Sequence, residues 1–421
     1  MIEGIIRLAA EQESIIRVLI SLAVLLFAAK IFAELFNKLR LPAVLGELLA
    51  GIIMGPFALG SLSNFDGKPL VILNETVRQI GEIAGVVILF IAGLHITPKE
   101  FLKGGAASFT IGACGVIVPF FLGYYAFTIF GLEGLQSILI ATALTATSVA
   151  ISVTVLTELG KMQTREAKLI LGAAIVDDIL AIAVLSVVVT MVQTGNLTPN
   201  IVDIIFLILK ILGIFIALLI GAIIIIPRIV NTEKLWKARG SAEGIVTASF
   251  FGASALAAAV GLSPIVGAFS VGMAVASTKI IKRVEEYVDK LEIIFAPLFF
   301  AIIGAQVNLN GINLNVLLLS SLVIAVAIVS KLIGCGLPAT IFLRDKSKAM
   351  KVGIGMISRG EVGLIVAGIG VSSGVLSADV YTTIIIMVAV TTLITPVWLK
   401  KVYGKELSNS DGKNISRTKI K

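Results

Sequence analysis

The sequence predicts an all-α membrane protein that crosses the bilayer about thirteen times. Hydrophobic residues make up 57% of the 421 residues and charged residues only 14%, whereas soluble domains carry about 25% charged residues. The mean hydropathy is +1.06, and apolar stretches of about 20 residues, the length that crosses the hydrocarbon core, recur along the chain. We therefore expect one transmembrane unit over residues 1–403, followed by a short basic cytoplasmic tail, 404–421.

The predicted spans follow one another with short connections. In order they cover 15–36, 42–57, 77–96, 104–130, 135–158, 166–192, 201–226, 242–260, 263–278, 290–306, 315–343, 350–373 and 379–400. Loops after odd-numbered spans are rich in Lys and Arg, while those after even-numbered spans hold only Lys68, with Arg78 at the next span's entrance. The positive-inside rule then places the C-terminus in the cytoplasm and the N-terminus outside. The net charge of +8 thus indicates topology and not nucleic-acid binding.

A weak internal repeat relates spans that lie seven apart. Segment 41–51 resembles 263–272, each with a proline followed by two glycines five residues apart; 82–93 resembles 292–304, and 145–148 resembles 358–361. Because seven is odd, the two copies cross the membrane in opposite directions, which is the inverted-repeat architecture of secondary transporters. Such folds bind their ion where two matching helices are interrupted.

The fifth and twelfth spans are the candidates for these interruptions. The run 142–148 concentrates hydroxyl side chains that compete with helical hydrogen bonds, and four glycines within 353–363 loosen the twelfth span. Arg359 and Glu361 bring charge to the middle of the same span. The alternative is that the small residues only allow close helix packing.

Two adjacent acids, Asp177 and Asp178, lie inside an apolar run in the sixth span. A charged aspartate at the bilayer centre costs about 2.5–3.5 kcal/mol, so such residues usually face a wet cavity or an opposite charge; the alternative is a pair that only holds helices together. Neighbours on a helix point about 100° apart, so the two acids should meet different partners. Lys331, mid-span without an acid in its own helix, is a partner for one. The other can alternate between a proton and a small cation, which is antiport.

The run 145–148, the aspartate pair, Lys331 and the Arg-Gly-Glu at 359–361 together resemble the sodium/proton antiporters of the monovalent cation/proton antiporter superfamily, close to the bacterial NapA type. The resemblance covers about residues 15–400. It implies that Asp178 alternates between ion and proton and that Asp177 pairs with Lys331. It also implies that Thr147, Ser148 or nearby backbone carbonyls help hold the ion, with Na⁺ at Asp178 and Asp177. Arg359 and Glu361 would balance helix dipole ends.

The resemblance further implies electrogenic exchange of sodium or lithium for protons at the cell membrane, by an elevator-like movement within a homodimer. The moving ion-binding bundle would comprise about 77–192 and 290–373, and the dimerisation scaffold 15–57, 201–278 and 379–400. We expect no cofactor besides the transported ions, and no nucleic-acid or soluble partner.

Three other functions compete with this interpretation. Potassium/proton exchange uses the same fold, and sodium-coupled symport of an organic anion is disfavoured by the aspartate pair with Lys331. Intramembrane proteolysis by two aspartates needs acids that converge on one substrate atom, which adjacent residues cannot do; we therefore expect no enzyme. Glu47, Glu82 and Glu158 either line a cytoplasmic entrance or only pair near helix ends. His95, the single histidine, is either a pH sensor or an ordinary interfacial residue.

Overall fold

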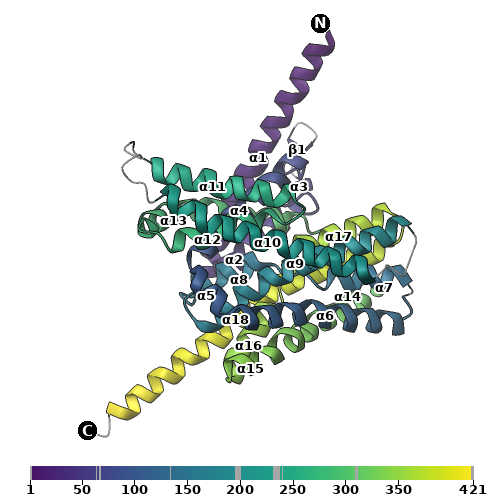
Figure 1. Ribbon diagram of the computed structural model, residues 1–421. Coiled ribbons are helices and arrows are strands. Elements are labelled where there is room, and N and C mark those ends of the chain that lie inside the picture. The colour runs from purple at the N-terminus through teal and green to yellow at the C-terminus, as the bar shows by residue number, and fades with distance from the viewer. Residues whose placement is uncertain are drawn as a thin grey trace.

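The computed structural model describes residues 2–62, 64–65, 68–132, 134–194, 201–230, 238, 240–308 and 312–418. The chain forms a bundle of long helices (Figure 1). In this described part, nine helices are long and apolar enough to span a membrane, and four shorter apolar helices of 10–17 residues accompany them. The two strands, β1 (Asn64–Phe65) and β2 (Lys68–Pro69), form a minimal hairpin. The predicted all-helical membrane fold is confirmed, and the count of thirteen crossings stays a prediction.

The helices follow the apolar stretches of the sequence. The first half contains α1 (Ile2–Lys38), α2 (Ala43–Met54), α3 (Leu59–Leu62), α4 (Glu75–Leu94), α5 (Pro98–Lys103), α6 (Gly105–Ile129), α7 (Gly134–Ala143), α8 (Val149–Glu158) and α9 (Arg165–Thr194). The second half contains α10 (Ile201–Val230), α11 (Ser241–Ala259), α12 (Pro264–Ala276), α13 (Ile281–Ala305), α14 (Leu314–Lys331), a π-helical turn (Leu332–Gly336), α15 (Leu337–Leu343), α16 (Lys346–Gly355), α17 (Glu361–Ser372) and α18 (Ala378–Thr418). The gaps between α7 and α8, and between α16 and α17, fall where the sequence predicts interruptions.

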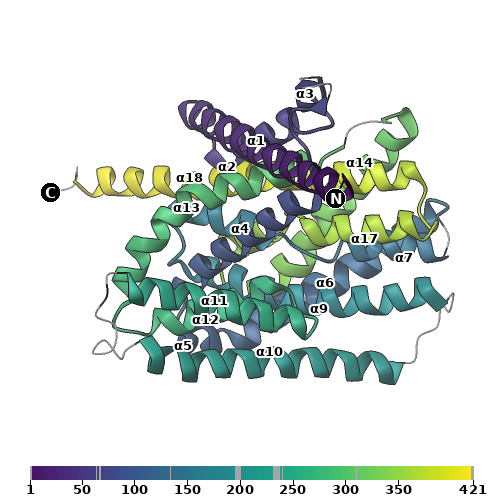
Figure 2. The same ribbon diagram turned by 90° about the horizontal axis from the view of Figure 1, so that it is seen from above.

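The helices pack in two groups. α1, α2, α4, α11, α12 and α13 contact one another extensively, and so do α6, α7, α9, α14, α17 and α18. α10 packs against α9 as well as α12, so it links the two groups along one edge of the bundle (Figure 2). The ion-site candidates on α9 and in the two interruptions all belong to the second group.

Glycines allow the closest helix contacts in the first group. A Cβ added at Gly51 would overlap the carbonyl oxygen of Ala301, so α2 and α13 cross with their backbones in contact. α4 and α12 cross in the same manner, because a Cβ at Gly93 would overlap the carbonyl oxygen of Phe269. Small residues at helix crossings are the usual route to tight packing in lipid.

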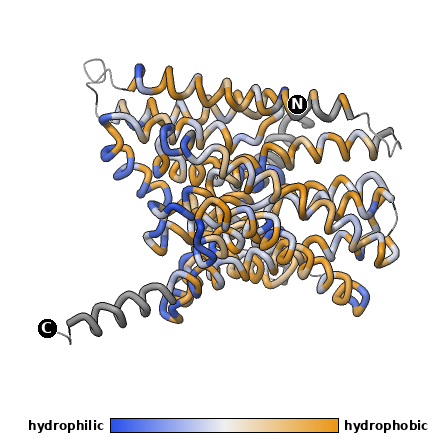
Figure 3. Tube along the Cα trace, turned by 60° about the horizontal axis from the view of Figure 1, so that its bottom comes forward, coloured by the Kyte–Doolittle hydropathy of each residue, from blue (hydrophilic) through white to orange (hydrophobic). Residues whose placement is uncertain are grey.

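The outer surface of the bundle is apolar. The large hydrophobic side chains of Phe27, Phe206 and Ile341 are 70%, 70% and 71% exposed. Hydrophobic residues predominate along the helices (Figure 3). In water such exposure would be unfavourable, whereas a surface that faces lipid tails requires it. The chain is therefore a multi-pass membrane protein.

Candidate ion-binding site

The two helix interruptions meet each other. The backbone N–H of Ser148 donates to the carbonyl oxygen of Ser358 at 2.9 Å, and the Ser358 hydroxyl donates to the carbonyl oxygen of Ser148 at 3.0 Å. Gly360 permits this approach, since an added Cβ would lie 2.9 Å from the Cβ of Ser148. Helix ends leave backbone N–H and C=O groups without helical partners, so this meeting point gathers polar backbone groups inside an apolar bundle.

Arg359 satisfies carbonyl groups at this meeting point. Its fully buried guanidinium donates to the carbonyl oxygens of Ala146 at 3.2 Å, Thr145 at 3.4 Å and Ala327 at 3.1 Å. A cation beside the carbonyl end of a helix is electrostatically favourable, so Arg359 is placed to balance the end of α7. Glu361 begins α17, but its side chain lies outside the described part of the structure.

Lys331 contacts Asp177. The Lys331 ammonium donates to Asp177 Oδ1 at 2.6 Å and to the carbonyl oxygen of Thr145 at 2.8 Å, and both side chains are fully buried. Asp177 Oδ2 is also buried and has no hydrogen-bond partner among the described residues. The hydroxyl of Thr147 lies close enough to the Asp177 carboxylate to interact with it, and it donates to Met356 O at 3.4 Å. A buried acceptor without a donor requires an explanation, and a bound cation would supply one.

Two residues that adjoin this ion pair were missed by sequence reasoning. Gly115 on α6 faces it: an added Cβ would lie 2.7 Å from Cys335 Sγ, 3.3 Å from Asp177 Oδ1 and 3.5 Å from Lys331 Nζ. Cys335 lies in the π-helical turn directly after Lys331, and such turns are frequent at functional sites. One glycine among 40 gives no signal in a sequence.

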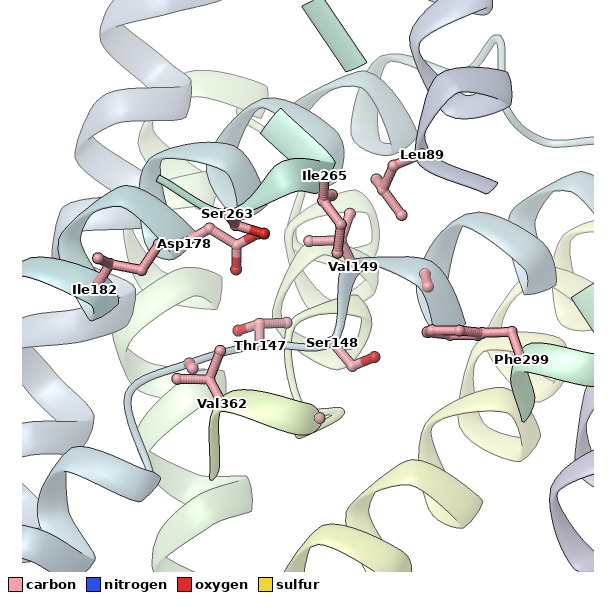
Figure 4. Close-up of a pocket in the computed structure, with 13 residues that line it drawn as sticks. Leu89, Thr147, Ser148, Val149, Asp178, Ile182, Ser263, Ile265, Phe299 and Val362 are labelled. Atoms are coloured by element: carbon pink, nitrogen blue, oxygen red, sulfur yellow. The ribbon is translucent and has the colours of Figure 1, made fainter. Parts of the chain in front are cut away.

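Asp178 points to a different space. It lines a cavity of about 30 Å³ with Thr147, Ser148 and other residues, and its carboxylate is directed toward the 147–148 segment (Figure 4). A cavity of this size holds about one water molecule or small cation. The carboxylate, the two hydroxyls and the backbone carbonyls of the interruption are all oxygen donors, which small hard cations prefer.

A second cavity, of about 510 Å³, adjoins the small one, and both are lined by Ile182, Ser263, Ile265, Phe299 and Val362. The surroundings of Asp178 thus lie beside this wider vestibule, which is also lined by Arg78 and Glu82.

This placement corrects one expectation, because Glu82 does not share an entrance with Glu158. Its neighbour Gly81 adjoins Ile302 near the end of α13. Glu292, which interacts electrostatically with Glu158, lies ten residues, about 15 Å, farther back along that helix.

Glu158 links α8 to the first group of helices, at the end of the bundle away from Glu82. As the last residue of α8, it accepts hydrogen bonds from the backbone N–H groups of Ala43 and Val44, each at 3.2 Å. These are first-turn donors of α2 that have no partner within the helix. Glu158 is thus a capping residue for α2, and this contact links α8, the helix that follows the 144–148 interruption, to the group that contains α2.

A second buried ion pair was also missed. Lys351 on α16 lies 3.2 Å from Glu166 on α9, and both side chains are buried. The Lys351 ammonium also lies 4.1 Å from the ring centroid of Tyr403 on α18. In the sequence both charges fall near predicted span ends, where a basic loop residue and a helix-end acid carry no special signal. The pair ties α16 and α18 to the helix that carries the aspartates.

Ionisable groups buried at the centre of an apolar helical bundle are typical of membrane proteins that move ions. The chain belongs to the sodium/hydrogen exchanger family, whose transmembrane region matches residues 21–403. The family predicted from the sequence is thereby confirmed.

Relatives support this assignment, and a solved structure shows the same fold. The chain is 34% identical to the high-affinity Na⁺/H⁺ antiporter NhaS3 of Synechocystis, over 92% of this chain and 90% of that protein. It is also 34% identical to the Na⁺/H⁺-K⁺ antiporter GerN of Bacillus cereus, over 91% and 95%. The structure of the sodium proton antiporter MjNhaP1 from Methanocaldococcus jannaschii has the same fold, with a TM-score of 0.65 and 17% identity over 93% of this chain and 98% of that one.

Proposed function

We propose that the protein exchanges sodium or lithium ions for protons across the cell membrane, and that the exchange is electrogenic. The observation that carries the proposal is the separation of the two aspartates: Asp178 faces a cavity sized for one small cation, while Asp177 is bonded to Lys331. A proton and a sodium ion cannot both occupy the Asp178 carboxylate. Competition between them at one site, with access from one side at a time, produces antiport.

Lys331 gives this site its electrogenic step. Two opposite unit charges about 4 Å apart attract by roughly 4 kcal/mol at an effective dielectric constant near 20. A cation that binds near Asp178 and reaches Oδ2 of Asp177, which accepts no hydrogen bond from the residues that the structure describes, competes with the Lys331 ammonium for that carboxylate. Lys331 then gives up its proton, so that more than one proton is exchanged for each sodium ion.

The elevator movement is proposed to shift one group of helices against the other. The moving body comprises α6 to α9 and α14 to α18, and the scaffold comprises α1, α2, α4 and α10 to α13. This division of the helices differs from the moving bundle and scaffold predicted from the sequence. Segments 77–96 and 290–306, assigned there to the moving bundle, pack as α4 and α13 against α2, α12 and each other, while 379–400 packs as α18 against α14 and α17. Helices with large shared contacts move together. The scaffold is also the proposed homodimer interface.

An inverted repeat, with the N-terminus outside and the C-terminus in the cytoplasm, completes the proposal. Two pairs of contacts support it. The offset of seven spans matches α2 with α12 and α4 with α13. The α2–α13 crossing at Gly51 and Gly304 therefore corresponds to the α12–α4 crossing at Gly272 and Gly93. The bonded residues Ser148 and Ser358 likewise come from the matched segments 145–148 and 358–361.

The test is ion-driven proton movement in everted membrane vesicles. Addition of sodium or lithium should collapse a preset pH gradient, Asp178→Asn should abolish the response, and the control Asp289→Asn, at an exposed position on α13, should retain it. Unchanged activity in Asp178→Asn would refute the site.

Selectivity and electrogenicity need two further measurements. Potassium belongs in the cation panel because GerN, by its name, also handles K⁺; a response to potassium alone would replace sodium/proton by potassium/proton exchange. Lys331→Gln should lose the transport current on solid-supported membranes while it retains sodium-dependent proton exchange. A wild-type current would refute the role of Lys331.

A further inference from the structure

A third cavity, of about 380 Å³, lies away from the ion path. Its walls come from α5, the first turns of α6 and α9 and the end of α15, and it shares no lining residue with the two cavities near Asp178. α5 and α15 lie toward the end of the bundle from which α18 projects (Figure 1). The loops at this end are the basic ones, which the positive-inside rule places in the cytoplasm.

The lining of this cavity is cationic. Lys103, Arg165 and Lys168 line it, opposed by the single acid Glu100. Lys168 donates to Glu100 at 2.6 Å, and this hydrogen bond holds the pKa of Glu100 below its ordinary value, so the acid stays ionised as a partner for Lys168. Lys103 and Arg165 therefore leave an excess of two positive charges at the mouth.

Arg165 is held in place for an external ligand. One N–H of its guanidinium donates to the carbonyl oxygen of Phe342, at the end of α15, at 3.2 Å. A guanidinium has five N–H donors in a planar fork that suits phosphate oxygens. The bond to Phe342 thus fixes the orientation of the fork and leaves other donors for an anion.

The cavity also has apolar walls that continue onto the lipid-facing surface. Phe101 and Phe342 line the cavity. Just beyond this lining, the side chains of Phe109 on α6 and Ile341 on α15 are 48% and 71% exposed. A free inorganic anion gains nothing from apolar walls, whereas a phospholipid has a phosphate for the basic residues and acyl chains for the surface beside them.

We infer that this cavity binds the phosphate headgroup of an anionic phospholipid from the cytoplasmic leaflet, with Arg165 and Lys103 on the phosphate and the acyl chains along α6 and α15. Basic pockets between helices at the cytoplasmic interface are suited to such lipids. The inference stands on this cavity alone and does not depend on which cation the protein transports.

The test is lipid binding to the purified, delipidated protein by native mass spectrometry, with phosphatidylglycerol against phosphatidylcholine. Phosphatidylglycerol should bind preferentially. The double variant Arg165→Gln/Lys103→Gln should lose about 30-fold in affinity, because each basic residue near an anionic lipid contributes about fivefold. The control Lys282→Gln/Lys290→Gln, at exposed positions on α13, should bind as the wild type does.

Glu100→Gln should change the affinity for phosphatidylglycerol in the opposite direction. It removes the acid and releases Lys168, so phosphatidylglycerol should bind at least about fivefold more tightly. Equal binding of the two lipids, or equal losses in the double variant and its control, would overturn the inference. Saturable stabilisation of the protein by inorganic phosphate, with no further effect of phosphatidylglycerol, would replace the lipid by a free anion and would also overturn it. Sodium-dependent proton exchange, measured in parallel, separates either outcome from a failure of the transport proposal.

Discussion

Gly115→Ala tests whether the Asp177–Lys331 pair depends on the space beside it. The added Cβ would lie 2.7 Å from Cys335 Sγ, closer than Cβ atoms approach any neighbour, while its 3.3 Å distance to Asp177 Oδ1 requires a shift of only a few tenths of an ångström. Overpacking of a filled core costs about 1–3 kcal/mol. Because the sulfur causes the overlap, Cys335→Ala should relieve it, and the double variant should be about 2 kcal/mol more stable than the sum of the single effects predicts.

The assay is a double-mutant cycle on the free energy of unfolding in mixed detergents, read together with sodium-dependent proton exchange. Gly105→Ala is the matched control, because it lies on the same helix and its Cβ would meet nothing within 4 Å. Gly115→Ala should lower both stability and transport, and the double variant should recover both. Additivity of the two substitutions within about 0.5 kcal/mol would show that Gly115 and Cys335 are not coupled, and would refute the reasoning.

Two further predictions concern ionisable groups outside the central site. Glu158→Ala removes the cap of α2 at Ala43 and Val44, and a lost cap costs about 1 kcal/mol, so amide hydrogen exchange of residues 43–46 should rise about fivefold; unchanged exchange would contradict the capping role. His95, at the end of α4, has its pKa lowered from 6.5 by burial, against the opposing fields of Glu285 and Asp289. As the pH falls through 6.5, His95 binds a proton in the unfolded chain but remains mostly neutral in the folded protein. The stability of the folded protein therefore declines. His95→Gln should therefore flatten the loss of melting temperature from about pH 7.5 to about pH 5.5; an unaltered profile would exclude His95 as a cause.

Much of this architecture could be predicted from the sequence, because burying charge in lipid is costly. Asp177, Asp178 and Lys331 could be identified without coordinates, since each interrupts an apolar run that has no other reason to contain it. Helix existence followed from hydropathy in the same way. The grouping of the helices could not be predicted, because α4, α13 and α18 are all apolar helices and their partners depend on which glycines and side chains fit together. Contacts such as Glu158 with α2 join residues more than 100 positions apart.

In the proposed mechanism, the aspartate pair makes the two loaded states differ in charge. When the carboxylate of Asp178 carries a proton, the site holds one neutral acid and one balanced pair, Asp177 with Lys331. When it carries a sodium ion and Lys331 has released its proton, the site holds two carboxylates and one cation, one elementary charge more negative. Arg359 donates hydrogen bonds to the carbonyl oxygens of Ala327 on α14 and of Thr145 and Ala146 in the interruption after α7, so we assign it no part in this difference. If the proposed exchange is correct, that single charge crosses the membrane once per cycle and is worth about 2.3 kcal/mol per 100 mV. The membrane potential can then drive sodium exchange, which an isolated Asp178 without Lys331 would not allow.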